Sequence, residues 1–185
     1  MINRLIKHFS ELTTTQLYQI LALRSEVFVV EQECIYQDLD HKDQEAIHVL
    51  GIDVNNKLIS YARILPPGVI YPEFAIGRVI VAHSHRGTGE GHRLMDYCMT
   101  SIETMAGELI AEVIRLHPRI RIIALSQFDE DAYTHRALKA GARGYLMKSE
   151  ATEAVLTAIE TVMNGGIHLS PRMAARLLQN IFPDS

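Results

Sequence analysis

The sequence IGRVIVAHSHRGTGEGHRL at residues 76–94 decides how the first half of the chain folds. It begins with an apolar, β-branched run, continues through a polar segment with three glycines, and then shows helical spacing from Leu94 to Ile102. This order predicts a strand, a loop and a helix. Glycines let the backbone approach a ligand, and the unpaired amides of a new helix carry a partial positive charge. We therefore expect this loop to bind a phosphate group, with Arg86 as an added cation.

The ligand of this loop is narrowed by its spacing. The loop does not match the Gly-x-x-x-x-Gly-Lys-Ser/Thr pattern of nucleoside triphosphate loops, nor Gly-x-Gly-x-x-Gly opening a first βαβ unit. A tight connection without a ligand is the alternative, because glycines also mark ordinary turns. The string RGTGEG at residues 86–91, preceded by GRVIV at residues 77–81, resembles the pyrophosphate signature Arg/Gln-x-x-Gly-x-Gly/Ala of GNAT N-acetyltransferases.

This resemblance implies a site for acetyl-coenzyme A as a cosubstrate. In the GNAT family the loop amides hold the coenzyme pyrophosphate, and the preceding strand splays to offer backbone groups to the pantetheine arm and the thioester. Carried onto this chain, the implied coenzyme-binding residues are Val79, Ile80, Val81, Arg86, Gly87, Thr88, Gly89, Glu90, Gly91 and His92.

Composition and charge limit the class of the protein. The 185 residues are 48% hydrophobic and carry a formal net charge of −4, which predicts a globular, soluble chain with a buried core. This mildly acidic balance gives no electrostatic footprint for nucleic acid. No secretory segment follows Met1 and no apolar run is long enough to cross a bilayer, so we expect no membrane partner. Cys34 and Cys98 do not form a disulfide framework, which favours a reducing cytoplasm.

The first residues mark an N-terminal helix. Thr13 and Gln16 have the spacing of a capping box, flanked by Leu12 and Leu17 as a hydrophobic staple. Apolar residues then recur at steps of three and four as far as Phe28, which predicts a helix that covers a sheet.

A polar segment after this helix carries a more specific resemblance. Asp38, Asp40 and Asp43 suggest a cation site, but the glycine and closing glutamate of a calcium loop are missing, so solvated loop carboxylates are the alternative. The sequence LRSEVFVVEQECIYQDLDHKD at residues 23–43, with His48 after it, resembles the ElaA-type branch of the GNAT family. In that branch this region forms the acceptor side of the cleft.

Three strands are expected before the loop. Residues 47–54 and 58–65 flank Asn55-Asn56-Lys57, and asparagine tolerates the left-handed backbone of a tight hairpin. Pro66-Pro67-Gly68 ends the pairing, and a third strand at residues 76–81 leads into the loop.

The second half of the chain alternates helices and strands. The pattern predicts helix 107–117, strand 120–126, helix 129–140 with Asp129 as N-cap, strand 144–148, helix 152–164 and a short helix after Ser170-Pro171. Alternation of this kind favours parallel strands joined by right-handed crossovers.

This half resembles the C-terminal half of a response-regulator receiver domain, of the type that precedes a helix-turn-helix module. The resemblance covers residues 105–175 and places Ser126, Tyr145 and Lys148 at the switch and phosphate-contact positions of that family. The phosphoacceptor aspartate of the family has no counterpart, because the strand before helix 107–117 ends in IVAH at residues 80–83.

The two resemblances together predict a chimera, natural or engineered, with parts at residues 1–104 and 105–185. Each half-sheet alone leaves an open edge, and open edges invite pairing. We therefore expect one merged α/β domain, in which an antiparallel GNAT-like meander is continued by parallel flavodoxin-like strands, with strand 120–126 beside strand 76–81 and helices on both faces. Two separate incomplete domains, or an oligomer formed through the open edge, are the alternatives. Residues 89–117 form either one helix or two helices broken near Gly107.

Acetyl transfer needs a base for the amine, backbone N–H groups for the thioester oxygen, and a proton for the departing thiolate. The base candidates are Glu31, Glu73 and His48, and Tyr133 is the local candidate for the acid. His83 and His85 lack companion ligands at zinc spacing and are interpreted as loop residues, so no metal is expected.

The sequence is compatible with three alternative functions. The first is N-acetyl transfer from acetyl-coenzyme A to a small-molecule or peptide amine. The second is a folded GNAT/receiver chimera without turnover, and the third is a receiver-type signalling module that lacks its phosphoacceptor.

Overall fold

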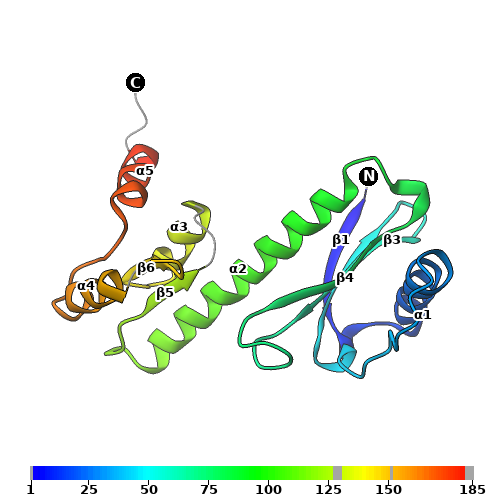
Figure 1. The fold of residues 1–185 in the computed structure, drawn as a ribbon, viewed down its shortest axis with the longest axis horizontal. Helices are drawn as coiled ribbons and strands as arrows, with labels where there is room; N and C mark the ends of the chain where they lie inside the picture. Colours follow the sequence, from blue (N-terminus) through cyan, green and yellow to red (C-terminus); the bar gives the residue numbers. More distant parts are fainter. Residues whose placement is uncertain (1, 127–130, 151, 182–185) are drawn as a thin grey trace. The chain divides into compact units, whose positions relative to one another are not determined.

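The computed structural model describes residues 2–126, 131–150 and 152–181. By its internal contacts the chain divides into two compact units, Met1–Thr100 and Ser101–Ser185. Each unit combines helices with a small sheet (Figure 1).

The first unit is built on a four-stranded antiparallel sheet in the order β1-β2-β3-β4. Its elements are β1 (Asn3–His8), α1 (Thr14–Arg24), β2 (Ile47–Ile52), β3 (Leu58–Leu65), β4 (Ala75–Val81) and the first turns of α2 (Glu90–Leu116). The hairpin between β2 and β3 turns at Asn56, whose φ of 60° lies in the left-handed region as expected. Strand β1 was not expected from the sequence; it pairs antiparallel with β2 at the edge of the sheet.

Helix α1 begins with the expected capping box. The Thr13 hydroxyl accepts from the Gln16 amide, and the Gln16 side chain accepts from the Thr13 amide. The helical path then widens into a π-helix at Ser25–Glu31, where the Gln32 amide donates to the Val27 carbonyl. Widened turns of this kind often occur at functional sites, and this one delivers Glu31 and the segment that follows it.

The two central strands are buried along their whole length. On one face Leu50, Ile59 and Tyr61 pack against Ile20 and other residues of α1 in a single apolar cluster. On the other face the Ser60 hydroxyl donates to Glu90 at the start of α2. Figure 1 shows α1 and the first turns of α2 on opposite sides of the strands. Side chains alternate across a strand, so both faces of this sheet have cover.

Strand β4 contains a bulge at its centre. Tyr61 pairs with Ile80 and Arg63 pairs with Gly77, so Arg78 and Val79 both lie opposite Ala62. Arg78 takes a positive φ of 54° at this point. A bulge bends its strand and leaves the extra residue unpaired.

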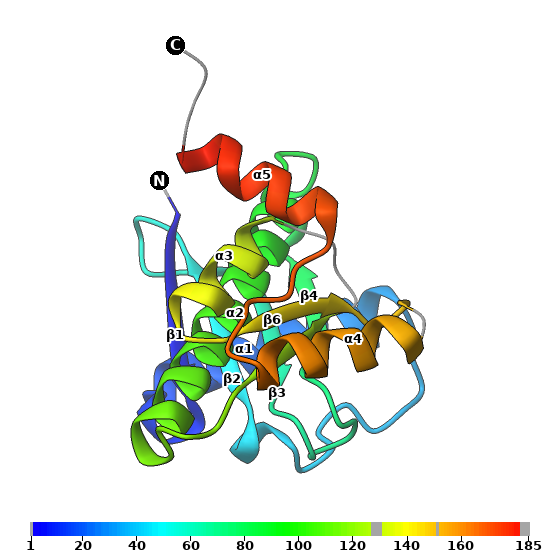
Figure 2. The same cartoon turned by 90° about the vertical axis from the view of Figure 1, so that its left-hand side faces the viewer.

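The second unit contains a parallel strand pair between helices. Its strands are β5 (Ile123–Ser126) and β6 (Gly144–Met147), and its further helices are α3 (Asp131–Lys139), α4 (Thr152–Met163) and α5 (Pro171–Ile181). Tyr145 belongs to the cluster that includes residues of α3 and α5, while its neighbour Leu146 is also fully buried. Figure 2 shows α3 and α4 on either side of β6.

The expected α/β class, with antiparallel and parallel strands, is confirmed. The expected pairing of strand 120–126 with strand 76–81 is corrected: among the described residues, β5 hydrogen-bonds to β6 in a separate two-stranded sheet. Strands β5 and β6 are connected through α3, and their facing backbone groups hydrogen-bond to each other and not to β4. Residues 90–116 form one helix, so the cost of about 1 kcal/mol for glycine at position 107 does not break it.

Two further expectations concern the helices of the second unit. Ser170 caps α5, since its hydroxyl accepts from the Met173 amide. The expected cap at Asp129 lies outside the described residues. Within the described part of the chain, every helix is too short or too polar to span a membrane.

Candidate functional site

The loop between β4 and α2 is exposed and shaped by two glycines. After a 3₁₀ turn at His83–His85, Gly87 and Gly89 take φ values of 74° and 78°. The Thr88 hydroxyl donates to the His85 carbonyl and closes the turn. Residues 86–89 are all exposed, and α2 begins directly after them at Glu90. The first amides of a helix have no intrahelical acceptor, so this loop presents donors and a positive helix end to one region of solvent.

A buried carboxylate anchors this helix start to the sheet. The Glu90 side chain is fully buried; it accepts from the Ser60 hydroxyl at 2.8 Å and from Arg4 Nη2 at 2.7 Å. A Cβ at Gly51 would lie 2.0 Å from Ser60 Oγ, so that position leaves room only for glycine. The sequence places Glu90 among the coenzyme-binding residues, but its side chain is directed into the fold and is not available to a ligand.

Arg86 is tied to the end of the π-helix. Its two terminal nitrogens donate to the two Glu31 carboxylate oxygens at 2.6 and 2.8 Å, and its Nε donates to the Val81 carbonyl at 3.0 Å. Such fork-to-fork pairing fixes geometry as well as charge. The hydrogen bond from Arg86 lowers the pKa of Glu31, so in this state Glu31 is an ionised and weak base.

Arg78 ties the bulge of β4 to the same polar segment. Its Nε lies 2.6 Å from Asp38 Oδ1, and its Nη2 donates to the Asp38 carbonyl at 3.0 Å and to Asp40 at 3.4 Å. The guanidinium also lies over the Tyr36 ring, 5.4 Å from its centroid. A left-handed backbone at a residue with a side chain costs about 1–3 kcal/mol and persists where its surroundings hold it, as these contacts do.

The three aspartates of the segment neutralise three arginines. Arg24 donates to Asp38 at 2.8 Å and to Asp43 at 2.9 Å, and Arg63 donates to Asp40 at 2.7 Å and to Asp43 at 2.8 Å. The hydrogen bond from Arg63 holds the pKa of Asp40 far below its ordinary range. These carboxylates are therefore neither solvated nor arranged for a cation. Among the described residues, no group of three or more His, Cys, Asp or Glu is placed to hold a metal ion.

This network of arginines and aspartates was not expected from the sequence. The signal in the sequence is a charged residue, Arg63, inside a mostly apolar strand, together with Asp38, Asp40 and Asp43 at close spacing. A buried arginine requires a carboxylate partner, so the two features belong together.

His48 is engaged at both ring nitrogens. Its Nδ1 lies 2.9 Å from the Tyr61 hydroxyl, and its Nε2 lies 2.9 Å from the Asp43 carbonyl oxygen. The carbonyl only accepts, so Nε2 carries the proton and Nδ1 accepts from Tyr61. Burial lowers the pKa of this histidine, which keeps it neutral. With its lone pair taken, His48 fits a structural role better than that of a catalytic base.

The remaining candidates lie in different surroundings. Glu73 is exposed in the loop before β4, and His92 is exposed in the first turn of α2. Val79, in the bulge, is 38% exposed, while Ile80 beside it is buried. Tyr133 belongs to α3 in the second unit, where it packs against a cluster that includes Ala137 and Tyr145.

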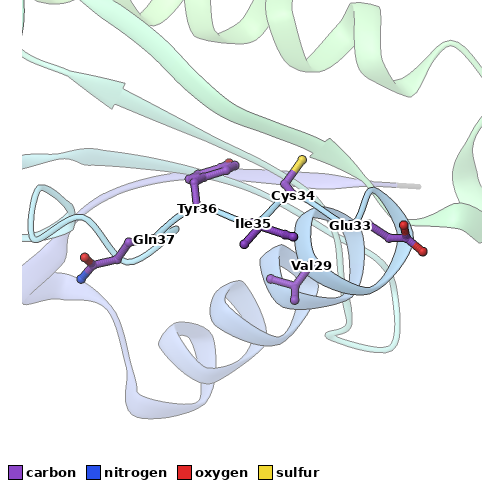
Figure 3. Close-up of a pocket in the computed structure, with 6 residues that line it drawn as sticks. All are labelled: Val29, Glu33, Cys34, Ile35, Tyr36 and Gln37. Carbon is purple, nitrogen blue, oxygen red and sulfur yellow. The ribbon is translucent and has the colours of Figure 1, made fainter.

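A pocket of about 690 Å³ lies along the segment that follows the π-helix. Six residues line it: Val29, Glu33, Cys34, Ile35, Tyr36 and Gln37. Figure 3 shows the side chains of Cys34 and Tyr36 on the same side of the chain trace. The pocket is shallow and open to solvent.

Comparison with known proteins identifies the class of the first half. The family profile described as acetyltransferase (GNAT) domain matches residues 10–117, more than half of the chain. The chain belongs to the GNAT acetyltransferase family. Protein ElaA of Escherichia coli K12 is 48% identical over 90 residues, which cover 48% of this chain and 58% of ElaA. A crystal structure of an acyl-CoA N-acyltransferase from Pseudomonas aeruginosa matches with a TM-score of 0.54 at 36% identity, covering 57% of this chain and 73% of that one.

The C-terminal half is similar to receiver-type response regulators. The response regulator GacA of Pseudomonas protegens is 35% identical over 92 residues, which cover 50% of this chain and 42% of GacA. The chain therefore spans well under two thirds of both ElaA and GacA. Both resemblances expected from the sequence are confirmed, and the interpretation as a chimera of two incomplete parts fits them.

Proposed function

We propose that this protein binds acetyl-coenzyme A at the loop of residues 86–92 and transfers the acetyl group to an amine. The observation that carries the proposal is the exposed loop between the bulged strand and the first turn of α2. Its geometry offers consecutive N–H groups and a positive helix end, which suit a diphosphate. The name of the Pseudomonas aeruginosa neighbour, an acyl-CoA N-acyltransferase, supports the same reaction class.

The reaction makes one bond and breaks one. The lone pair of the amine nitrogen attacks the thioester carbonyl carbon, and the carbon–sulfur bond then breaks with its electron pair leaving on sulfur. The nitrogen loses a proton to a base, and the thiolate of coenzyme A gains a proton. Backbone N–H groups at the β4 bulge, near Val79 and Val81, are the proposed donors to the carbonyl oxygen during attack.

Glu31 and Glu73 are the proposed candidates for the base. Arg86 has its guanidinium committed to Glu31, so a diphosphate that draws Arg86 away would release a carboxylate beside the coenzyme. Tyr133 remains the proposed proton donor to the thiolate. Unchanged turnover in Tyr133→Phe would remove Tyr133 from the mechanism, and unchanged turnover in Glu31→Gln would leave Glu73.

Calorimetric titration of the full chain with coenzyme A tests the binding site. Thr88 is exposed in the loop, so Thr88→Glu adds a negative charge there without disturbing the core. We expect it to weaken binding about 10-fold or more through repulsion of the diphosphate, whereas Thr88→Lys leaves binding equal or tighter. Thr15→Glu, at an exposed position in the first turn of α1, is the matched control and leaves binding unchanged.

The absence of heat with coenzyme A at millimolar concentration would overturn the proposed site. A thiol-release assay with acetyl-coenzyme A over a panel of amines then separates the enzyme from a chimera without turnover. Binding with no thiol release for any amine would favour the latter.

A further inference from the structure

The parallel strand pair of the second unit has one open edge. The carbonyls of Ile122 and Ser126 accept from the two amides that flank β6, at 2.7 and 2.6 Å. Backbone groups of successive residues point to opposite edges of a strand, so those of Ile123 and Leu125 point away from β6. Among the described residues β5 pairs with β6 alone. A strand edge of this kind is a template for pairing with another chain.

The face of this pair that lies against α4 is only partly covered. Tyr145 packs in the cluster that includes residues of α3 and α5. Because side chains alternate along a strand, Leu146 and its register partner Leu125 face the other way, towards α4. Figure 2 shows α3 and α4 on either side of β6. Leu146 is fully buried, whereas Leu125 is 53% exposed, so the cover given by α4 ends before the open edge.

Helix α4 carries an apolar stripe that the second unit leaves exposed. Its members follow each other at steps of three and four and are 56%, 45% and 63% exposed: Leu156, Ile159 and Met163. On the other flank of α4, the Thr161 side chain lies against Gly166, in the segment that pairs with β6 at His168. Thr161 lies almost opposite the stripe around the helix, so the stripe is directed to the side of β5.

The two ends of this surface carry opposite charges. Arg121, exposed just before β5, donates to the Val162 carbonyl at 3.0 Å and to the Met163 carbonyl, at the end of α4. Glu153 is exposed in the first turn of α4, about 14 Å away along the helix. A second copy of the surface, turned end for end, would therefore place each arginine near a glutamate.

We propose that the open edge of β5 and the apolar stripe of α4 bind the same surface of a second copy of this chain. The two copies are related by a two-fold axis at Ala124, so their β5 strands are antiparallel. Ile123 then lies opposite Leu125 of the second copy, and each such pair exchanges two backbone hydrogen bonds, because both residues direct their N–H and C=O groups to the open edge. A parallel arrangement would bring like charges together.

The spacing of the layers supports a second copy as the occupant. Helix α4 contacts both β5 and β6, so it lies over its own strand pair. In the joined sheet the centres of the two pairs are two strand spacings apart, which is about 9.6 Å. Helices pack with their axes about 8 to 10 Å apart. The two α4 helices therefore meet along their exposed stripes, and the joined sheet is covered on this face.

Sedimentation velocity of the full chain over a range of protein concentrations tests the interface. We expect a reversible equilibrium between one chain and two. Leu125→Lys places a charge in the centre of the interface in both copies and should weaken the dimer about 100-fold. The side chain is 53% exposed, so the single chain should keep its fold, as far-UV circular dichroism would show. Leu178→Lys on α5, 56% exposed, is the matched control and should leave the dimer unchanged.

A charge swap tests the orientation of the two copies. Glu153→Arg should weaken the dimer about 10-fold, because it faces Arg121 of the second copy. Adding Arg121→Glu to this variant should restore most of the lost affinity. Within one chain the two positions are about 14 Å apart, beyond a Debye length of about 8 Å, so a rescue reports a contact between copies. Glu108→Arg, at an exposed position on α2, is the control and should leave the dimer unchanged.

The outcomes decide between a second copy and any other cover. A chain that stays single at every concentration would overturn the proposal, because something other than a second copy then covers the surface. A dimer that Leu125→Lys leaves intact would place the interface elsewhere. If Leu125→Lys does not fold, the charge swap decides, and a dimer that the swap does not rescue contradicts the antiparallel arrangement. Each measurement is made without coenzyme A, so none depends on the proposed function.

Discussion

The two units of this chain differ in how completely they cover their own sheets. In the first unit, β2 and β3 are buried from end to end, and even the charged residues Arg24 and Arg63 are enclosed with their partners. In the second unit, Leu125 on β5 is 53% exposed, and α4 exposes Leu156, Ile159 and Met163. The first unit thus has layers that enclose its core, whereas part of the second unit's apolar surface faces solvent. We therefore expect a mutation in a covered sheet to lower the free energy of unfolding more than one in an exposed sheet.

Removal of a buried charge partner should give the largest effect. Arg63→Met leaves Asp40 with only its longer contact to Arg78 and Asp43 with only Arg24, and breaking a buried pair costs about 3 to 5 kcal/mol of unfolding free energy. Urea unfolding followed by modification of Cys98, which becomes accessible when this unit opens, measures the loss. The matched control is Arg115→Met on α2, whose partner Glu112 is exposed; it should leave stability unchanged. Equal effects at the two positions would contradict the difference between the units.

Crowding at the helix anchor should come next. Gly51→Ala places a Cβ 2.0 Å from Ser60 Oγ and disturbs the contact of Ser60 with Glu90. Overpacking together with a broken buried hydrogen bond costs about 2 to 3 kcal/mol. Gly107→Ala has its nearest neighbour at 3.9 Å and should be neutral or stabilising by up to about 1 kcal/mol. Calorimetric Tm values compare the two, and a stable Gly51→Ala protein would show that the sheet gives way easily there.

Acidification should weaken the first unit. Burial lowers the pKa of His48 below its ordinary 6.5, so the unfolded chain binds more protons, and stability falls as the pH drops below 6.5. The hydrogen bond from Arg63 lowers the pKa of Asp40, so its contribution is present above the ordinary 3.8 and is lost as the pH falls further. Cys98 modification in urea, measured between pH 7 and pH 4, should show earlier unfolding. A midpoint that does not change in this range would refute the role given to His48.

Substitution on the uncovered face of the second unit should have the smallest effect. Leu156 is 56% exposed on α4, so Leu156→Lys removes little buried surface and should change stability by no more than about 0.5 kcal/mol. Its measurable result is weaker fluorescence of a hydrophobic dye such as anilinonaphthalene sulfonate, because the apolar surface becomes smaller. A loss as large as that of Gly51→Ala would mean that this face is packed.

Much of the local structure could be predicted from the sequence. The capping box at Thr13, the left-handed turn at Asn56, the order of strand, loop and helix around residues 76–94, and the cap at Ser170 are confirmed. These features depend on residues close in sequence, where hydrogen bonds and backbone preferences act over one turn. Both family resemblances could be recognised from the sequence for the same reason, because each depends on motifs of contiguous residues.

The tertiary structure decided the features that join distant residues. Strand β1 has a weak pattern of its own and exists because β2 offers it an edge. Glu90 lies within the loop motif, but its carboxylate accepts hydrogen bonds from Arg4 and Ser60. The Nδ1 lone pair of His48 accepts from the Tyr61 hydroxyl. The parallel pair β5–β6 stands apart from the antiparallel sheet because backbone hydrogen bonds go to whichever strand the chain brings alongside. Sequence alone thus determined the local elements and the glycine-containing loop of residues 86–92, whereas the assignment of buried charges and strand edges required the three-dimensional neighbours, since desolvation acts only on groups that folding encloses.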